Sequence, residues 1–163
     1  MIRKKVCMLG AFAVGKTSLV RRFVEDRFSD RYVTTIGVKV TKKRLVRDGV
    51  EVILMLWDLH GDDAFQTVQA SYLRGSSGLL LVADGTRGET FEVARSLRQR
   101  ALDAGVDVPF LLLVNKADLA ADWDEPEDAV PEGWTRIDTS ARTGAGVEEA
   151  FALLTERMLE GPA

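Results

Sequence analysis

The chain has 163 residues, a length that suits one domain with a single hydrophobic core. Apolar residues make up 46% and charged residues 29%, which is ordinary for a globular protein and excludes disorder or low-complexity sequence as the main content. With 22 basic and 25 acidic residues the net charge is -3, so no overall positive field favours nucleic acid as a partner.

The first predicted element is a short apolar strand at residues 6–9, and a glycine-bearing loop follows it directly. Residues 10–17 read GAFAVGKT and fit the pattern G-x-x-x-x-G-K-[ST] at every required position. Gly10 and Gly15 allow the backbone to curl closely around a phosphate, so that successive N–H groups point inward. Lys16 supplies a charge for the β- and γ-phosphates, and the hydroxyl of Thr17 can ligate Mg²⁺. The loop therefore predicts a nucleoside-triphosphate site with these phosphate-binding residues: Gly10, Ala13, Val14, Gly15, Lys16, Thr17 and Ser18.

A helical pattern follows the loop, and a hairpin follows the helix. The stretch 36–46 is extended, Asp48-Gly49 carries the signal of a tight turn, and 50–57 returns as a more apolar and more central strand. The stretch 39–47 is rich in lysine and arginine. A solvated edge strand explains these charges, since edges commonly carry lysine, and a docking strip for an acidic partner explains them as well.

Two continuous apolar runs, 78–83 and 110–114, have the character of strands that are buried on both faces of a parallel sheet. An amphipathic helix is predicted between them, and a second one closes the chain at 147–158. The acidic segment 122–132 contains two prolines and is predicted to be a surface loop or a stunted helix. Strands that alternate with helices predict a doubly wound α/β sheet with a hairpin at one edge.

A second motif follows the run 110–114. Asn115-Lys116-Ala117-Asp118 fits N-K-x-D, a pattern that is weak alone but strong at the carboxyl end of a parallel strand that follows a phosphate loop. The carboxylate of Asp118 would accept hydrogen bonds from the N1–H and the exocyclic amine of guanine, whereas adenine offers no such pair of donors. Sites that hydrogen-bond a polar group of the ligand in this way discriminate against analogues that lack the group by a factor of roughly 10⁴ to 10⁵. The predicted base is guanine.

Taken in order, these motifs resemble those of the Ras superfamily of small GTPases, and within it the Rab-like members. Further segments match in order: 32–38 resembles switch I, 57–61 resembles the entrance of switch II, and 72–75 and 139–142 match other family segments. The resemblance covers nearly the whole chain. It implies a single P-loop NTPase (small G-protein) domain at residues 1–163, with a mostly parallel six-stranded sheet, one antiparallel edge strand and helices on both faces. It also implies GTP and GDP as ligands and Mg²⁺ as the cofactor.

The resemblance assigns roles to single residues. Thr35 would be the second hydroxyl on Mg²⁺, and Asp58 would hold the metal through a water. The N–H of Gly61 would meet the γ-phosphate, Phe28 would lie edge-on against the guanine, and the N–H of Ala141 would read the base oxygen. The implied sets are Thr17, Thr35 and Asp58 for the metal; Lys16, Thr35, Gly61 and Asp62 for catalysis; and Phe28, Asn115, Lys116, Asp118, Ser140, Ala141 and Arg142 for guanine. A core position for Phe28 and plain loop positions for Thr35 and Asp58 are the alternatives.

Four positions depart from the family pattern. Asp62 stands where glutamine usually follows the switch II glycine; an ionised aspartate only accepts hydrogen bonds and adds negative charge beside a polyanion, which predicts slow hydrolysis. Phe12 replaces a small residue, and its ring either obstructs an arginine finger or turns away onto a switch. His60 either positions water or is a passive switch residue. Arg142 replaces a lysine where the base contact runs through the backbone, so this change should matter little.

The leading hypothesis is a guanine-nucleotide switch that hydrolyses GTP to GDP slowly and whose loops change with the γ-phosphate. The alternative is a GTP-binding scaffold with little or no hydrolysis, which Asp62 and Phe12 keep open. A P-loop kinase is disfavoured, because the two guanine segments argue against it and no acceptor domain is left. Expected partners are an effector at switch I and the 39–47 strand, an exchange factor and a GTPase-activating protein.

The single cysteine, Cys7, cannot close an intramolecular disulfide, which makes a reducing compartment the default. No apolar run approaches the ~20 residues that span a bilayer, no signal-peptide stretch opens the chain, and no cysteine near its end is available for a prenyl group. We therefore expect a cytoplasmic protein with no intrinsic membrane anchor and no nucleic-acid partner.

Overall fold

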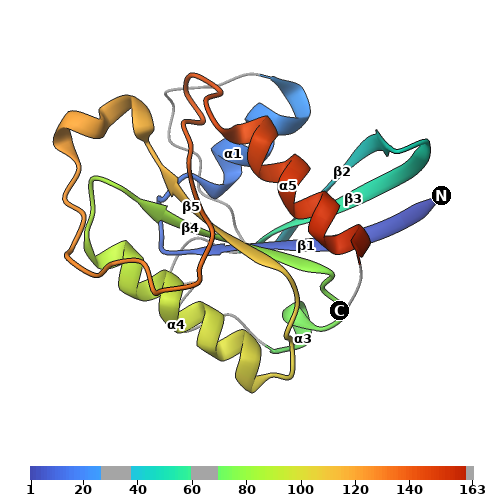
Figure 1. The fold of residues 1–163 in the computed structure, drawn as a ribbon, viewed down its shortest axis with the longest axis horizontal. Helices are drawn as coiled ribbons and strands as arrows, with labels where there is room; N and C mark the ends of the chain where they lie inside the picture. Colours follow the sequence, from blue (N-terminus) through green and yellow to red (C-terminus); the bar gives the residue numbers. More distant parts are fainter. Residues whose placement is uncertain (27–37, 60–69, 161–163) are drawn as a thin grey trace.

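The computed structural model describes residues 1–26, 38–59 and 70–160. Within these ranges six strands form one sheet in the order β2-β3-β1-β4-β5-β6 (Figure 1). The strands are β1 (Ile2–Gly10), β2 (Val38–Arg47), β3 (Val50–Leu59), β4 (Gly78–Asp84), β5 (Phe110–Asn115) and β6 (Arg136–Asp138). The helices are α1 (Lys16–Glu25), α3 (Ala70–Leu73), α4 (Glu89–Asp103), α5 (Val147–Glu160) and the 3-10 helix η1 (Ala117–Asp122).

All neighbouring strands pair in parallel except the edge strand β2, which is antiparallel to β3. The turn between β2 and β3 holds Asp48 at φ 51° and Gly49 at φ 77°. Positive φ at both central residues is what a two-residue hairpin with the right-handed twist of its strands requires. The predicted fold class, a mostly parallel six-stranded sheet with one antiparallel edge strand, is confirmed.

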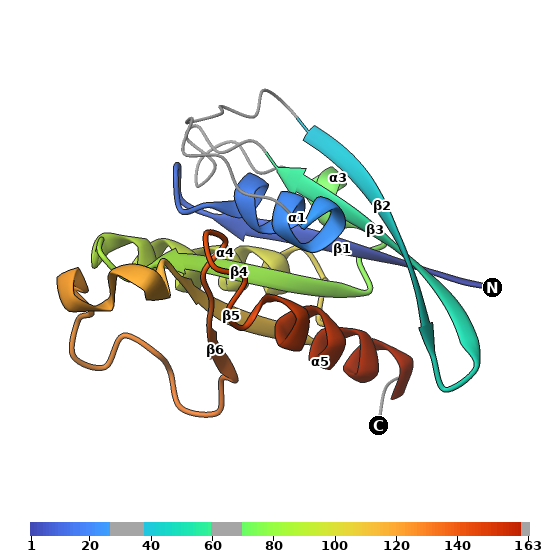
Figure 2. The same cartoon turned by 90° about the horizontal axis from the view of Figure 1, so that it is seen from above.

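Two hydrophobic cores lie on opposite faces of the sheet. Along β1 the buried side chains alternate, with Val6 and Met8 in one core and Cys7 and Leu9 in the other. Helices α1 and α5 cover the first face side by side, and α4 covers the second (Figures 1 and 2). The predicted helices on both faces are therefore present.

The structure also shows where the sequence patterns were incomplete. β1 begins at Ile2, four residues before the apolar run at 6–9, and β6 has only three residues, of which Ile137 alone is buried, so no apolar run marks it. The segment 122–132 forms no helix or strand after η1, in agreement with the predicted loop or stunted helix. Among the helices of the described ranges, none combines the length and the apolar character needed to cross a bilayer.

The parallel strands bring their carboxyl ends to one edge of the sheet (Figure 1). The phosphate loop follows β1, Asp58 lies near the end of β3, Asp84 ends β4 and Asn115 ends β5. In open α/β sheets this edge is where ligands bind.

Candidate nucleotide-binding site

The phosphate loop has a backbone that only particular residues tolerate. Ala13 has φ 62° and Gly15 has φ 104°, both in the left-handed region. A Cβ atom at Gly15 would lie 2.3 Å from Nδ2 of Asn115, and one at Gly10 would lie 2.4 Å from the carbonyl oxygen of Val82. Close approach thus requires glycine at both positions, and at Gly15 the left-handed backbone conformation requires it as well.

Lys16 lies inside this loop and is only 4% exposed. Its Nζ donates to the carbonyl oxygens of Gly10 at 3.1 Å and of Ala11 at 3.2 Å. Burial lowers the pKa of Lys16 to about 8, and the negative charge of Asp58 offsets part of that shift. A buried ammonium group that is surrounded by the backbone of the loop is well placed to bind an anion.

The structure brings together two of the three residues assigned to the metal. The hydroxyl of Thr17 donates to a carboxylate oxygen of Asp58, which is 2% exposed. A hydroxyl and a carboxylate are hard oxygen donors, the kind that Mg²⁺ prefers and holds together with phosphate oxygens and water. The donor chemistry of this pair therefore fits Mg²⁺.

Asn115 connects the phosphate loop to the segment at 139–141. Its Nδ2 donates to the carbonyl oxygen of Val14 at 3.0 Å. Its Oδ1 accepts from the hydroxyl of Thr139 at 3.2 Å and from the N–H of Ala141 at 3.3 Å. The N–H that the resemblance assigned to the base oxygen is therefore directed at Asn115 in this structure.

Asp118, the residue expected to read guanine, is exposed, and Ser140 holds it in place. The hydroxyl of Ser140 donates to Oδ1 of Asp118 at 2.8 Å and accepts from the N–H of Thr143 at 3.1 Å. The N–H of Ser140 donates to the carbonyl oxygen of Ala145 at 2.9 Å. A buried, doubly anchored serine thus fixes the orientation of the carboxylate.

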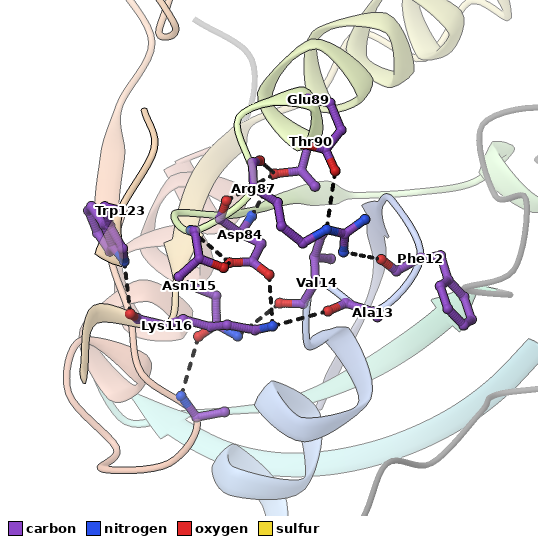
Figure 3. Close-up of polar contacts among 12 residues, drawn as sticks. Phe12, Ala13, Val14, Asp84, Arg87, Glu89, Thr90, Asn115, Lys116 and Trp123 are labelled. Carbon is purple, nitrogen blue, oxygen red and sulfur yellow. Dashed lines mark hydrogen bonds and ion pairs between the residues drawn. The ribbon is translucent and has the colours of Figure 1, made fainter. Parts of the chain in front are cut away.

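Lys116 adopts φ 73° and reaches back toward the phosphate loop (Figure 3). Its Nζ pairs with Oδ2 of Asp84 at 2.7 Å and donates to the carbonyl oxygen of Ala13 at 3.5 Å. The fully buried Asp84 also accepts from the N–H of Thr86 at 2.9 Å and from its hydroxyl at 2.7 Å. Asp84 was not among the predicted residues, although its place at the carboxyl end of an apolar strand was a usable signal.

Sequence reasoning missed three more residues at this site. Arg22 of α1 donates through Nε to the carbonyl oxygen of Ala141 at 2.8 Å and also reaches the carbonyl of Arg142. Trp123 donates through Nε1 to the carbonyl oxygen of Lys116 at 2.9 Å. Arg87 donates to the carbonyl oxygen of Phe12 at 2.7 Å. No local motif contains them, because each meets a backbone atom.

Five residues with predicted roles or notable departures lie outside the described residues: Phe28, Thr35, His60, Gly61 and Asp62. Phe12 is among the described residues and is 39% exposed. This exposure is compatible with a ring that obstructs an arginine finger and with a ring that turns onto a switch. The described residues that the sequence assigned to phosphate, metal and guanine nevertheless meet at one edge of the sheet, although they come from separate segments.

A glycine loop with a buried lysine, joined through one asparagine to an N-K-x-D segment, defines a P-loop nucleotide-binding domain. The chain matches the Ras family over residues 5–160 and belongs to that family of small GTPases. Its relatives include the Ras-related protein Rab-7L1 of Rattus norvegicus, which is 35% identical over 169 residues that cover 95% of this chain and 81% of the relative. The Ras-related protein Rab-8B of Homo sapiens is 32% identical over 161 residues (95% and 78%). The Ras-related protein Rab-13 of Canis lupus familiaris is 34% identical over 161 residues (95% and 79%).

Proposed function

We propose that this chain is a guanine-nucleotide switch that binds GTP and GDP with Mg²⁺ and hydrolyses GTP slowly. The observation that carries the proposal is the bridging role of Asn115, which joins Val14 of the phosphate loop to Ala141 beside the base-reading segment. One rigid connection between the two segments fits a ligand that carries both a phosphate chain and a base. Membership of the Ras family supports the same class of ligand.

The phosphate chain would lie along the inward-facing N–H groups of the loop and beside Lys16. Thr17 and Asp58 would hold Mg²⁺, which supplies positive charge to the β- and γ-phosphate oxygens. Lys16 would become fully protonated once an anion replaces its carbonyl partners, because the anion reverses the effect of burial. The reaction is the attack of water on the γ-phosphate, and these residues stabilise the charge that develops there.

The guanine would be read by Asp118, with its N1–H and exocyclic amine donating to the carboxylate that Ser140 orients. Lys116 would pack beside the base and ribose, and Phe28 would lie edge-on against the base. The Ala141 N–H, which donates to Asn115 in this structure, would have to turn from Asn115 to meet the base oxygen. Switching would depend on Thr35 and Gly61, which contact the nucleotide only while its γ-phosphate is present.

Slow hydrolysis is proposed because Asp62 stands where the family has glutamine. Repulsion between a carboxylate and a phosphate oxygen about 4 Å apart is about 1 to 4 kcal/mol, and each 1.4 kcal/mol is about tenfold in rate. Single-turnover GTP hydrolysis with Mg²⁺ tests this, with Asp62→Gln expected to be faster than the unchanged protein. An equal or lower rate in Asp62→Gln would remove the assigned role of Asp62.

A second candidate is a GTP-binding scaffold with little or no hydrolysis, favoured by the combination of Asp62 with the bulky Phe12 beside the phosphates. Multiple-turnover hydrolysis, measured with and without added activating proteins, separates the two. A rate that rises with an activating protein supports the switch, and a rate near zero under both conditions supports the scaffold.

An effector is proposed to dock at switch I and along the basic stretch 39–47. Two of its charges already have partners in the fold, since Arg44 pairs with Glu51 at 3.0 Å and Nζ of Lys43 lies 5.3 Å from the ring centre of Phe23. Lys42 carries no such contact among the interactions of the described residues and is the sharper probe. Charge reversal at Lys42 should slow capture of an acidic partner most strongly at low salt, and unchanged capture leaves only the solvated edge strand.

A further inference from the structure

Three consecutive carbonyl groups of the phosphate loop are each held from outside the loop by a different side chain (Figure 3). Arg87 donates to the oxygen of Phe12 at 2.7 Å. Lys116 donates to the oxygen of Ala13 at 3.5 Å and Asn115 to the oxygen of Val14 at 3.0 Å. Lys116 and Asn115 belong to the N-K-x-D segment, whereas Arg87 comes from the turn between β4 and α4.

The direction of a carbonyl fixes the direction of the N–H on the same peptide. The described peptide bonds are trans, so the C=O and the N–H of each peptide point to opposite sides. A carbonyl of Phe12 that is turned outward to Arg87 therefore turns the N–H of Ala13 inward. The same relation holds for the next two peptides, whose N–H groups belong to Val14 and Gly15. These N–H groups are the ones expected to line the phosphates.

The loop needs such support because Ala13 has φ 62°. A residue with a Cβ atom adopts this left-handed conformation only at an energetic cost, and it persists where the surroundings determine it strongly. The peptides on either side of Ala13 are held by Arg87 and by Lys116. Removal of one support should let Ala13 relax, and its N–H should then turn away from the phosphates.

Arg87 is itself firmly placed. Its Nε pairs with Glu89 in the first turn of α4 at 3.2 Å. The turn that carries it packs under Trp123, where a Cβ atom at Gly85 would come within 2.2 Å of the indole ring. The N–H of Asp124 donates to the carbonyl oxygen of Gly85 at 2.7 Å. Contacts with α4 and with the Trp123 segment therefore place the guanidinium beside the phosphate loop.

We propose that Arg87 is a positioning residue of the phosphate site, which acts through the Phe12 carbonyl to hold Ala13 in its binding conformation and so slows nucleotide release. The proposal rests on the proposed function, since it requires that the loop binds a guanine nucleotide. It adds a third support to the two that the N-K-x-D segment provides.

The test is the dissociation rate of fluorescently labelled GDP from the full chain in the presence of Mg²⁺. Arg87→Ala should release GDP about tenfold faster, which is the lower end of the effect of a charge-assisted hydrogen bond. Arg87→Lys keeps a cation with a shorter reach, so its rate of GDP release should lie between the rates of the unchanged protein and of Arg87→Ala. Arg95→Ala is the matched control, because Arg95, like Arg87, pairs with a glutamate of α4, in its case Glu92, but does not contact the phosphate loop. Equal rates for Arg87→Ala and Arg95→Ala would overturn the proposal.

A double-mutant cycle distinguishes positioning from a merely structural role. Ala13→Gly removes the cost of the left-handed conformation, so Arg87→Ala should speed GDP release by less than about threefold in that background. A tenfold effect that persists in Ala13→Gly contradicts the mechanism. If the unchanged protein binds no guanine nucleotide, the proposed function fails as well; if it binds and only the Arg87 effects are missing, this inference alone fails.

Discussion

The phosphate loop and the base-reading segment solve the problem of recognition in opposite ways. In the loop the groups proposed to bind the phosphates are backbone N–H groups, and side chains from distant segments donate to the carbonyl oxygens of the same peptides. In the N-K-x-D segment the group proposed to read the base is the side chain of Asp118, and the hydroxyl of Ser140 donates to its carboxylate. A site that acts through side chains can therefore be recognised from a sequence motif. The residues that hold the backbone of a backbone site are scattered along the chain and form no motif.

The largest expected effect is a loss of the preference for guanine over adenine nucleotides, which would separate the role of the N-K-x-D segment from that of the phosphate loop. Asp118→Ala removes the acceptor for both guanine donors but leaves the phosphate loop intact. The preference for GDP over ADP, expected to be on the order of 10⁴ in the unchanged protein, should fall to within about tenfold. Competition binding with the two nucleotides measures this. A variant that still prefers GDP by about a thousandfold would show that another group reads the base.

The next largest effect is a loss of stability when Asn115, which bonds to both the phosphate loop and the segment at 139–141, is replaced. Asn115→Ala leaves the carbonyl of Val14 and the N–H of Ala141 without their partner, and a buried polar group left in this way costs about 1–3 kcal/mol. The free energy of unfolding should therefore drop by about 3 kcal/mol, as measured by urea denaturation of the nucleotide-free protein. Asn115→Asp is the control that keeps the acceptor but not the donor, and it should lose less. A drop below about 1 kcal/mol for Asn115→Ala would mean that the two regions are not coupled through this side chain.

The sequence located the two glycines of the loop, whose close approach the structure shows, because they belong to a compact motif. A second compact motif supplied the prediction that Asp118 reads the base, and that role stays a prediction. The sequence did not predict Arg87 or Trp123, because both donate to backbone carbonyls and any residue type can supply a carbonyl. No strand pattern marked β6, and a sixth strand was expected only through the family resemblance, since the place of β6 comes from pairing with β5 and not from an apolar run of its own. Thr35 and Asp62 stay predictions.

A smaller effect concerns the charge inside the loop. Burial lowers the pKa of Lys16 from 10.5 to about 8, so the unfolded chain binds more protons than the folded one between about pH 8 and 10.5. Stability therefore rises with pH through this window, by about 1 kcal/mol from about pH 7.5 to 9 for this residue in the nucleotide-free, Mg²⁺-free protein. The pKa of the Cys7 thiol is raised by burial and acts in the opposite direction at higher pH.

Subtraction of a Lys16→Met variant isolates the contribution of Lys16, because the Cys7 contribution is common to both proteins. The unfolding free energy of the unchanged protein minus that of Lys16→Met should rise by about 1 kcal/mol from about pH 7.5 to 9. A difference that is constant from pH 7.5 to 9 would show that Lys16 keeps an ordinary pKa.

The smallest effect is expected at the residue that orients Asp118. Ser140→Ala removes a hydrogen bond of the ordinary kind, worth about 1 kcal/mol, so affinity for GDP should fall by about fivefold. Ser140→Thr keeps the hydroxyl and should lose less. Calorimetric titration measures both, and an unchanged affinity in Ser140→Ala would show that the carboxylate needs no support.

The most direct test of the account is a calorimetric titration of the unchanged, nucleotide-free protein with GDP and with ADP in the presence of Mg²⁺. The joint arrangement of the loop and the Asp118 carboxylate predicts that GDP binds on the order of 10⁴-fold more tightly than ADP. Equal affinity for the two nucleotides, or binding of neither, would contradict it.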